Sequence, residues 1–241
     1  MRIAVAGGTG MVGRHVVRAA AAAGHDPVAL SRSSGVDVRT GEGLDEALAG
    51  ADVIVDVTNA GTTNGDKATA FFTEVAGRLQ RAGAAAGVRH LVVLSIVGVD
   101  KAGSSGYYGA KLKHEEAAKG GSIAVSVLRA TQFHEFAGQW ISWTKKGPLV
   151  PVTRMPVQTV AAATVGTALA ELALGAPRPD TVELAGPEKA QFADLVRAVL
   201  HHQGQSALVV PLPVPGAAGR AIRRGALLAG PGTRIEVPTF S

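Results

Sequence analysis

A short apolar run followed at once by spaced glycines constrains this chain more than any other feature. Residues 2–13 read Arg-Ile-Ala-Val-Ala-Gly-Gly-Thr-Gly-Met-Val-Gly, and valines and alanines then recur at helical spacing until Gly24. This order predicts a buried parallel strand, a tight turn and a helix. Glycine permits the turn and a close approach to phosphate, and a helix N-terminus attracts an anion. The segment therefore predicts a site for the pyrophosphate of a dinucleotide, formed by Gly7, Thr9, Gly10, Met11, Val12 and Gly13.

The composition bounds the class of protein. The 241 residues suit one large domain or one domain with a small appendage, and 46% hydrophobic against 4% aromatic residues indicate an α/β core of small side chains. Cysteine is absent, which excludes disulfides and thiolate metal sites and fits a reducing cytoplasm. The net charge is +5, but the basic residues are scattered. We therefore expect no nucleic-acid partner.

The sequence contains two apolar segments that could be a signal peptide or a membrane span, and neither has the pattern of one. Glycines interrupt the N-terminal stretch, which we interpret as a first strand rather than a signal peptide. The apolar segment at 160–176 carries Glu171 and is too short to span a bilayer. We expect a soluble cytoplasmic protein without a membrane partner.

Strand-like and helix-like segments alternate along the first part of the chain. Besides the first strand, we expect strands at 27–30, 52–57, 90–95 and 123–129, a weaker strand candidate at 36–38, and helices at 44–49, 67–86 and 107–119. The alternation predicts an α/β fold with a Rossmann-like doubly wound parallel sheet, whose ligands lie beyond the carboxyl ends of the strands.

The sequence pattern changes after Gly147. Prolines precede an expected helix at 159–174, a strand at 181–184, a helix at 191–200 and a proline-rich run at 211–216. We interpret residues 1–147 as the NAD(P)-binding Rossmann-like region and residues 148–241 as a smaller, interleaved substrate-side region of the same compact unit. Residues 236–241 carry no helix cap or stop signal, which leaves a truncation there open.

The residues after the second strand indicate which dinucleotide binds. They read Leu30-Ser31-Arg32-Ser33-Ser34, without the carboxylate that an NAD-selective site places on the ribose hydroxyls. A guanidinium and hydroxyls suit a 2′-phosphate. Hydrogen bonds of charged groups contribute roughly 1.5–3 kcal/mol, which predicts about a 10- to 100-fold preference for NADP(H) over NAD(H). The alternative is that Arg32 is a solvated loop residue.

Two further residues are candidates for cofactor contact. Asp37 follows the weak strand candidate and is placed either to flank the adenine or to form a turn. Asn59 follows the next strand, where a loop would run beside the middle of the cofactor, and a simple turn is again the alternative.

The chemical signal is a tyrosine and a lysine one helical turn apart. Tyr107 and Lys111 share a helix face, and Ser95 stands at the carboxyl end of the preceding strand. A general acid or base near neutrality needs the tyrosine pKa lowered by about 3 units, or about 4 kcal/mol. One ammonium at about 4 Å supplies a similar energy at an effective dielectric constant near 20. We expect Tyr107, Lys111 and Ser95 to be catalytic, with Tyr108 as the alternative acid.

These stretches carry a family resemblance. Residues 7–13, 31–32 and 91–95, Tyr107-Tyr-Gly-Ala-Lys111 and Leu128-Arg-Ala-Thr-Gln-Phe133 together resemble the atypical short-chain dehydrogenase/reductase proteins of the NmrA-like, NAD(P)H-binding group. The resemblance covers most of the chain. It is strongest before Phe136 and weaker across the substrate-side region.

The resemblance implies a Rossmann-like fold with a nicotinamide cofactor across the carboxyl ends of the strands. It implies that Tyr107 donates a proton and that Lys111 anchors the ribose and modifies the tyrosine pKa. It also implies that Thr131, Gln132 and Phe133 lie near the nicotinamide and the substrate.

The residues and the resemblance together predict an NADPH-dependent oxidoreductase. Hydride from the nicotinamide and a proton from Tyr107 would reduce a small carbonyl, quinone or conjugated substrate. One alternative is a catalytically silent NAD(P)H-binding redox sensor that contacts a partner protein, and another is an isomerase or epimerase that retains its NAD(P). We expect a monomer or homodimer.

Other residues have simpler interpretations. His114 would neighbour Lys111 and could relay protons, but we expect an exposed helix histidine. His134-Glu135 lacks partner ligands at metal-site spacing, so we expect no metal. Trp140 and Trp143, with Phe133 and Phe136, form either a substrate pocket or an ordinary core.

Overall fold

The protein is described by a computed structural model that covers residues 1–236, and these divide into two units that alternate along the chain. Unit 1 comprises residues 1–95, 104–129 and 162–182, and unit 2 comprises residues 96–103, 130–161 and 183 onwards. The predicted boundary at residue 147 does not coincide with this division. Residues 130–147 cluster with unit 2, and the helix after residue 161 clusters with unit 1. The open question of a truncation at 236–241 falls almost entirely outside the described residues.

The strands of unit 1 form a parallel sheet. They are β1 (Arg2–Ala6), β2 (Asp26–Leu30), β3 (Val53–Asp56), β4 (His90–Ile96) and β5 (Ala124–Ala130), in the spatial order β5-β4-β3-β1-β2. β1 pairs in parallel with both β2 and β3, and β3 pairs in parallel with β4. Chain order and spatial order therefore differ at β1, as a doubly wound sheet requires.

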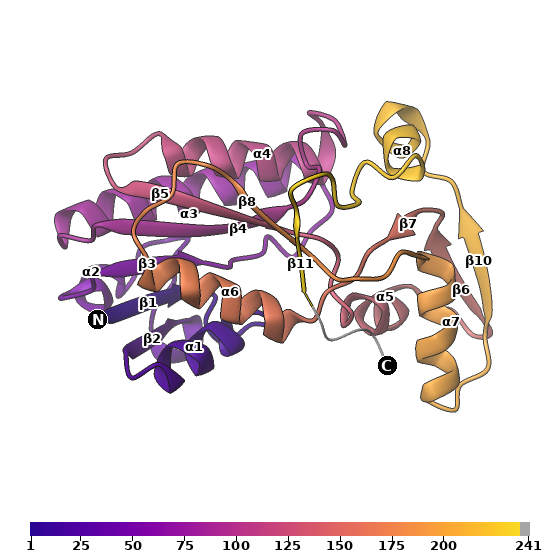
Figure 1. Cartoon of the computed structure of the whole chain (residues 1–241), viewed down its shortest axis with the longest axis horizontal. Coiled ribbons are helices and arrows are strands. Elements are labelled where there is room, and N and C mark those ends of the chain that lie inside the picture. Colours follow the sequence, from indigo (N-terminus) through magenta and orange to yellow (C-terminus); the bar gives the residue numbers. More distant parts are fainter. Residues whose placement is uncertain (237–241) are drawn as a thin grey trace. The chain divides into compact units, whose positions relative to one another are not determined.

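Helices cover both faces of this sheet. They are α1 (Gly13–Ala22), α2 (Leu44–Leu48), α3 (Gly65–Ala85), α4 (Gly106–Lys119) and α6 (Ala162–Leu174). Helices α3 and α4 pack together on one face, and α1 and α6 pack together on the other (Figure 1). The predicted Rossmann-like doubly wound parallel sheet is thereby confirmed.

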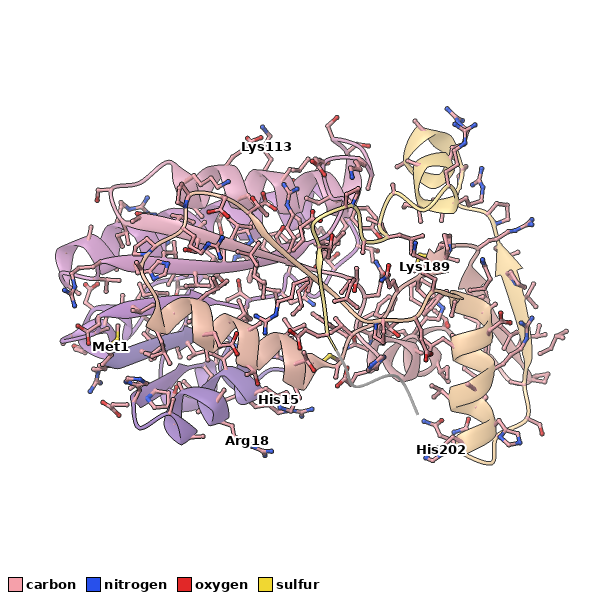
Figure 2. All side chains as sticks on the ribbon, in the orientation of Figure 1. Met1, His15, Arg18, Lys113, Lys189 and His202 are labelled. Carbon is pink, nitrogen blue, oxygen red and sulfur yellow. The ribbon has the colours of Figure 1, made fainter. Side chains whose placement is uncertain are left out.

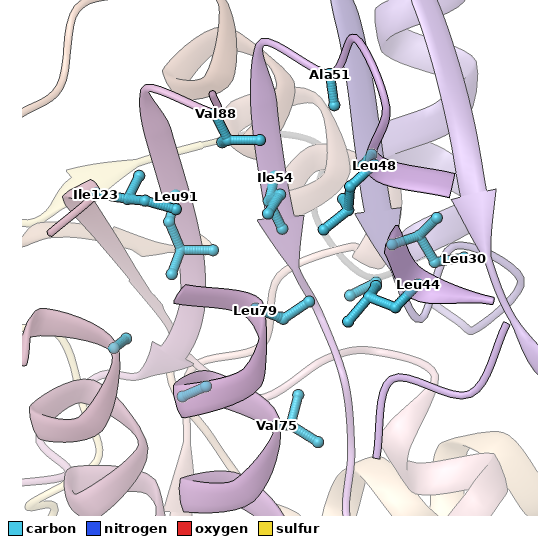
Figure 3. Close-up of a cluster of buried hydrophobic side chains, with 14 of the residues drawn as sticks. Leu30, Leu44, Leu48, Ala51, Ile54, Val75, Leu79, Val88, Leu91 and Ile123 are labelled. Carbon is cyan, nitrogen blue, oxygen red and sulfur yellow. The ribbon is translucent and has the colours of Figure 1, made fainter. Parts of the chain in front are cut away.

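The core of unit 1 fills the space between the sheet and α3. Figure 3 shows Val75 and Leu79 of α3 beside Ile54 of β3, with Leu44 and Leu48 of α2 closing one side. All five side chains are buried. Burying each such aliphatic side chain stabilises the fold by about 1.5–3 kcal/mol. This packing holds the ends of β1 to β4 in place, and the candidate site residues follow those ends.

The weak strand candidate at 36–38 is wrong. Only an isolated antiparallel bridge joins Asp37 to Glu42 there, so the strand expected at 52–57 is the third of the chain, β3. The carboxylate Oδ1 of Asp37 accepts hydrogen bonds from the backbone N–H groups of Arg39 at 2.8 Å and Thr40 at 3.3 Å. An aspartate that bonds to the backbone two residues ahead forms a turn in place of a sheet ladder.

Unit 2 consists of short elements. They are α5 (Phe136–Thr144), β6 (Leu149–Thr153), β7 (Pro156–Val157), β8 (Val182–Ala185), β9 (Ala190–Gln191), α7 (Phe192–His202), β10 (Leu208–Leu212), α8 (Gly216–Arg223) and β11 (Arg234–Ile235). β6 pairs in parallel with β10, β8 in parallel with β11, and β7 antiparallel with β9. The sequence predicted α7 and β8 but missed β6, β10, α5 and α8. Pro151 and Pro211 obscured the strand pattern, and a two-stranded ladder tolerates proline because both strands are edges.

No helix within residues 1–236 is long and apolar enough to cross a membrane. The apolar segment weighed from the sequence as a possible span is the 13-residue helix α6.

Candidate functional site

The glycine-rich turn between β1 and α1 has the predicted form. Gly7 adopts a φ of +78°, and its carbonyl accepts a hydrogen bond from the Gly10 N–H at 2.9 Å. A Cβ on Gly13 would lie 2.1 Å from the Gly7 oxygen, so only glycine lets α1 begin this close to the turn. The N-cap residue Val12 gives the first turn no side-chain hydrogen bond. The uncapped N-terminus of α1, beside the exposed Thr9 and Gly10, is suited to an anion.

Gly8 is a further requirement of this turn, and its role was not predicted from the sequence. A Cβ at Gly8 would lie 2.7 Å from the Cα of Ala29 on β2. The sequence does show two adjacent glycines, Gly7 and Gly8, at the start of the turn. Only the pairing of β1 with β2 explains why the second one cannot carry a side chain.

The residues after β2 fold into a single 3₁₀ turn, η1 (Arg32–Ser34). The Ser31 N–H donates to Ser34 Oγ at 3.1 Å, and Ser34 Oγ donates in turn to the Ser31 carbonyl at 2.8 Å. Arg32 is exposed, and within residues 1–236 its guanidinium has no hydrogen-bond or ion-pair partner. The turn therefore presents a free cation where the sequence predicts the 2′-phosphate, whereas Asp37 is engaged in its own turn.

Asp56, the last residue of β3, is buried and anchors the loop that follows. Its Oδ1 accepts hydrogen bonds from the Thr58 N–H at 2.9 Å and the Thr58 hydroxyl at 2.7 Å. The exposed Asn59 comes next, and its Oδ1 accepts from the Gly61 N–H at 3.2 Å and from the Tyr107 hydroxyl at 3.3 Å. The structure thus brings together two of the predicted site residues, Asn59 and Tyr107.

Tyr107 and Tyr108 lie in the first turn of α4, with their ring centroids 6.2 Å apart. Burial raises the pKa of Tyr107 to about 12, and burial together with Tyr107 raises the pKa of Tyr108 to about 12. The expectation that Lys111 lowers the Tyr107 pKa is wrong for this structure. The ammonium of Lys111 donates to Leu94 and His114, and desolvation is the effect that governs the phenol.

Lys111 is buried and held by two acceptors. Its Nζ donates to the Leu94 carbonyl at 2.8 Å and to His114 Nδ1 at 2.9 Å, and it lies 4.5 Å from the centre of the Phe72 ring. Burial lowers the pKa of Lys111 to about 8, against the charges of Asp56 and Glu115, which raise it. An ammonium has three N–H donors, so two are used and one is left for a ligand.

His114 is fully buried, which corrects the expectation of an exposed histidine. Its Nε2 lies 2.8 Å from Asp56 Oδ2, and its ring stacks on Phe72 at 4.8 Å. The buried face of α4 also carries Ala110, Glu115 and Ala118. The helical spacing of these buried positions can be found in the sequence, but several of them are polar, so the face does not show the apolar pattern of a buried helix face. The opposite face carries Lys113, which Figure 2 shows on the outside and which pairs with Glu116 at 2.6 Å.

Two predicted hydroxyls are buried without a partner. Ser95 Oγ, at the end of β4 in unit 1, has no hydrogen-bond partner among the described residues, and neither does Thr131 Oγ1 in unit 2. A buried hydroxyl without a partner is costly and is expected to be satisfied by a ligand or water. Ser95 directly follows Leu94, whose carbonyl holds Lys111.

Three aromatic residues of unit 2 pack against one another. Phe136 stacks on Phe192 at 5.3 Å, and Trp140 packs against both rings and donates its Nε1–H to the Pro151 carbonyl at 2.8 Å. Phe133 bridges to Val160, and Trp143 is 59% exposed. No group of three or more His, Cys, Asp or Glu that could hold a metal ion occurs among the described residues.

The residues of unit 1 fit a dinucleotide on two observations. The turn packs too closely at Gly8 and Gly13 to admit a Cβ, as a phosphate-binding turn requires, and Ser95 has a buried hydroxyl without a partner. Both features follow carboxyl ends of parallel strands, where α/β proteins bind nucleotides.

Comparison with known proteins agrees with this geometry. Residues 3–126, which include the glycine turn, Asp56, Tyr107 and Lys111, match the model of the NAD dependent epimerase/dehydratase family. A (4-alkanoyl-5-oxo-2,5-dihydrofuran-3-yl)methyl phosphate reductase of Streptomyces griseus is 32% identical over 151 residues, which are 57% of this chain and 50% of that protein. The chain therefore spans about half the length of this relative.

Solved structures share the fold. The chain aligns with a short-chain dehydrogenase/reductase superfamily protein of Agrobacterium tumefaciens with bound NAD at a TM-score of 0.67 and 17% identity, covering 94% of this chain and 96% of the other. Triphenylmethane reductase of Citrobacter sp., complexed with NADP(H), aligns at 0.68 and 18%, covering 95% and 92%. UDP-glucose 4-epimerase of Thermus thermophilus, complexed with NAD, aligns at 0.69 and 18%, covering 90% and 88%.

The resemblance to short-chain dehydrogenase/reductase proteins is confirmed. The assignment to the NmrA-like group within them stays a prediction. Since the family match extends over more than half of its residues, this chain belongs to the NAD dependent epimerase/dehydratase family.

Proposed function

We propose that this protein is an NADPH-dependent reductase of a small carbonyl, quinone or conjugated substrate. The observation that carries the proposal is the position of Tyr107, whose hydroxyl contacts Asn59 in the loop after β3. Its hydroxyl lies at the start of α4 beside Asn59, and burial raises its pKa to about 12. A phenol that keeps its proton at neutral pH is ready to donate it to a developing alkoxide or enolate.

The proton that a reduction needs is available from the same group. Reduction of a carbonyl consumes a proton, and the protonated Tyr107 can supply it. Oxidation of an alcohol needs a base to remove the hydroxyl proton, and a phenol with a pKa of about 12 is a poor base near pH 7. The protonated phenol therefore suits the proton-donating step of a reduction.

The cofactor in this proposal is NADP(H), which supplies the hydride when bound. The turn at residues 7–13 and the N-terminus of α1 would hold the pyrophosphate, and Ser31 and Arg32 the 2′-phosphate. Asn59 would contact the middle of the cofactor, Thr131 the nicotinamide end, and Lys111 the ribose. Asp37 would flank the adenine only if its turn opens, since its carboxylate already accepts two backbone hydrogen bonds.

One named relative supports a reductase. The Streptomyces griseus protein is named for reducing an oxo-dihydrofuran, a small ring with a carbonyl group, and its match to this chain is 32% identical. The Citrobacter protein is a reductase complexed with NADP(H), although its 18% identity supports only the fold. We further propose a small-molecule substrate, a monomeric or homodimeric state and a cytoplasmic location.

The test is NADPH oxidation by the purified protein against a panel of quinones, ketones, enones and unsaturated lactones. Tyr107→Phe removes only the hydroxyl, and we expect it to lower kcat by about 10²- to 10⁴-fold. Tyr108→Phe is the matched control, and we expect it to retain most of the activity.

Three results would contradict the proposal. Saturable NADPH binding without turnover of any panel member would favour a redox sensor. Bound cofactor that isomerises a substrate without net consumption would favour an epimerase. Unchanged activity in Tyr107→Phe with loss in Tyr108→Phe would assign the acid to Tyr108.

A further inference from the structure

Lys111, His114 and Asp56 form a series of buried hydrogen bonds in which each donor and acceptor can be assigned. Lys111 Nζ lies 2.9 Å from His114 Nδ1, and His114 Nε2 lies 2.8 Å from Asp56 Oδ2. Lys111 is 5% exposed, His114 0% and Asp56 1%. The three residues come from α4 and β3, so these hydrogen bonds join two elements of unit 1.

The chemistry of the end groups determines the state of the histidine. An ammonium only donates, so His114 Nδ1 must accept, and its proton then resides on Nε2 and is donated to the Asp56 carboxylate. Burial and the Lys111 charge lower the pKa of His114, which favours this neutral form. Burial would raise the pKa of Asp56, but the electrostatic interaction and hydrogen bond with His114, together with the hydrogen bonds from Thr58, outweigh burial and lower that pKa to about 2.

We propose that His114 is a positioning residue for Lys111, and that Asp56 holds His114 in the tautomer whose Nδ1 accepts from the ammonium. Phe72 of α3 supports this arrangement, because it stacks on the imidazole and lies against Nζ. Two of the three N–H groups of Lys111 are thereby directed at His114 and the Leu94 carbonyl. Because the ammonium is tetrahedral, these two hydrogen bonds also fix the direction of the third N–H group.

The other groups that face these three residues limit the alternatives. On α4, Glu115 is held by two hydrogen bonds from Arg129 of β5 at 2.9 and 3.0 Å, so its charge is already paired. α3 presents the uncharged Phe72, and β4 presents the Leu94 carbonyl and the neutral Ser95. Asp56 is therefore the carboxylate in contact with the imidazole, and His114 is the side-chain acceptor in contact with Lys111.

This inference rests on the proposed function, in which Lys111 serves the cofactor ribose. Because burial lowers the Lys111 pKa to about 8, the ammonium is close to losing its proton under mildly alkaline conditions. An acceptor at His114 Nδ1 stabilises the charged form. Loss of that acceptor is expected to move the Lys111 titration to lower pH.

Two substitutions separate the two nitrogens of His114. In His114→Asn the amide oxygen takes the place of Nδ1 and can accept from Lys111, while the contact with Asp56 is lost. In His114→Gln the amide N–H group reaches toward Asp56 in the place of Nε2, while the acceptor for Lys111 is lost. Lys113→Gln, on the outer face of α4, is the control.

We would follow the Lys111 side chain by NMR of lysine labelled at the ε position, with Lys111→Arg to assign the signal, and the alkaline limb of kcat/KM for NADPH oxidation. We expect His114→Gln to lower both apparent pKa values by about one unit. His114→Asn and Lys113→Gln should leave them within a few tenths of a unit. Equal shifts in the Asn and Gln variants would overturn the inference, because a merely structural histidine would be disturbed by both. An unchanged titration in His114→Gln would overturn it as well.

A measurement on the unsubstituted protein keeps the inference falsifiable if both variants fail to fold. Long-range ¹H–¹⁵N correlation of the histidine rings reports the tautomer of His114 directly. A neutral ring with the proton on Nε2 supports the inference, and a proton on Nδ1 overturns it. Neither NMR result depends on turnover, so a protein that reduces nothing would fail the proposed function while the role of His114 is still decided.

Discussion

His114 Nε2 lies 2.8 Å from Asp56 Oδ2, and neither side chain is more than 1% exposed. The two residues are 58 positions apart in the chain, and their contact ties α4, which carries Tyr107 and Lys111, to the end of β3. The position of the candidate catalytic helix therefore depends on one buried polar contact as well as on apolar packing.

Asp56→Ala is expected to destabilise the fold. Removing the carboxylate leaves the buried Nε2–H of the neutral His114 without an acceptor and costs about 1–3 kcal/mol. Urea unfolding followed by circular dichroism measures this loss. Asp180→Ala is the control, because Asp180 pairs with Arg178 on the exposed surface, where ion pairs contribute little. Equal unfolding midpoints for both variants would show that Asp56 does not stabilise the fold as predicted.

Stability should fall as the pH is lowered below about 6.5. Burial lowers the pKa values of His90 and His114 in the folded protein. The unfolded chain then takes up protons first as the pH falls through the ordinary histidine pKa, and this favours unfolding. The stability that the two histidines contribute is fully present above pH 6.5 and is lost below it.

Urea midpoints at pH 7.5, 6.0 and 5.0 test this dependence. His114→Asn should show a shallower decline, because one of the two buried histidines is gone. His202→Gln, at the exposed end of α7, should decline as the unsubstituted protein does. A decline that His114→Asn leaves unaltered would remove His114 from the explanation.

Gly13→Ala should impair NADPH binding. The new methyl group would lie 2.1 Å from the Gly7 oxygen, so the backbone of the turn must shift. Overpacking of this kind costs about 1–3 kcal/mol, and we expect at least a tenfold rise in the Kd for NADPH measured by fluorescence titration. Gly138→Ala in α5 meets no atom within 4 Å and should be neutral or slightly stabilising.

Arg32→Ala should change which cofactor binds. The exposed guanidinium has no partner within residues 1–236, so its removal leaves the fold intact. Loss of charged hydrogen bonds to a 2′-phosphate should raise the Kd for NADPH about 10- to 100-fold and leave that for NADH unchanged. Arg89→Ala, at the amino end of β4, should affect neither. An equal loss for both cofactors would argue against recognition of the 2′-phosphate by Arg32.

The sequence could predict the glycine turn, the parallel sheet and the positions of Tyr107 and Lys111, because each depends on short-range patterns. A buried parallel strand is a continuous apolar run, and a helix shows its period within a few turns. The strands and helices of unit 1 accordingly begin within about two residues of their predicted positions, apart from α6 and the turn at 36–38. In unit 2, two-residue strands and proline-containing strands carry too little periodic signal to be found.

The sequence by itself determined a chain with a Rossmann-like sheet and a phosphate-binding turn, since alternating apolar runs and a glycine-rich turn dictate local backbone geometry. Tertiary structure decided the electrostatics of the site. Whether a polar residue on α4 faces solvent or the interior depends on what α3 and β3 place opposite it. Phe72 and Asp56 bury His114, and His114 and the Leu94 carbonyl hold the ammonium of Lys111. A pKa follows from desolvation and from neighbours that are distant in the chain, so the protonation states of this site emerge only once the chain is folded.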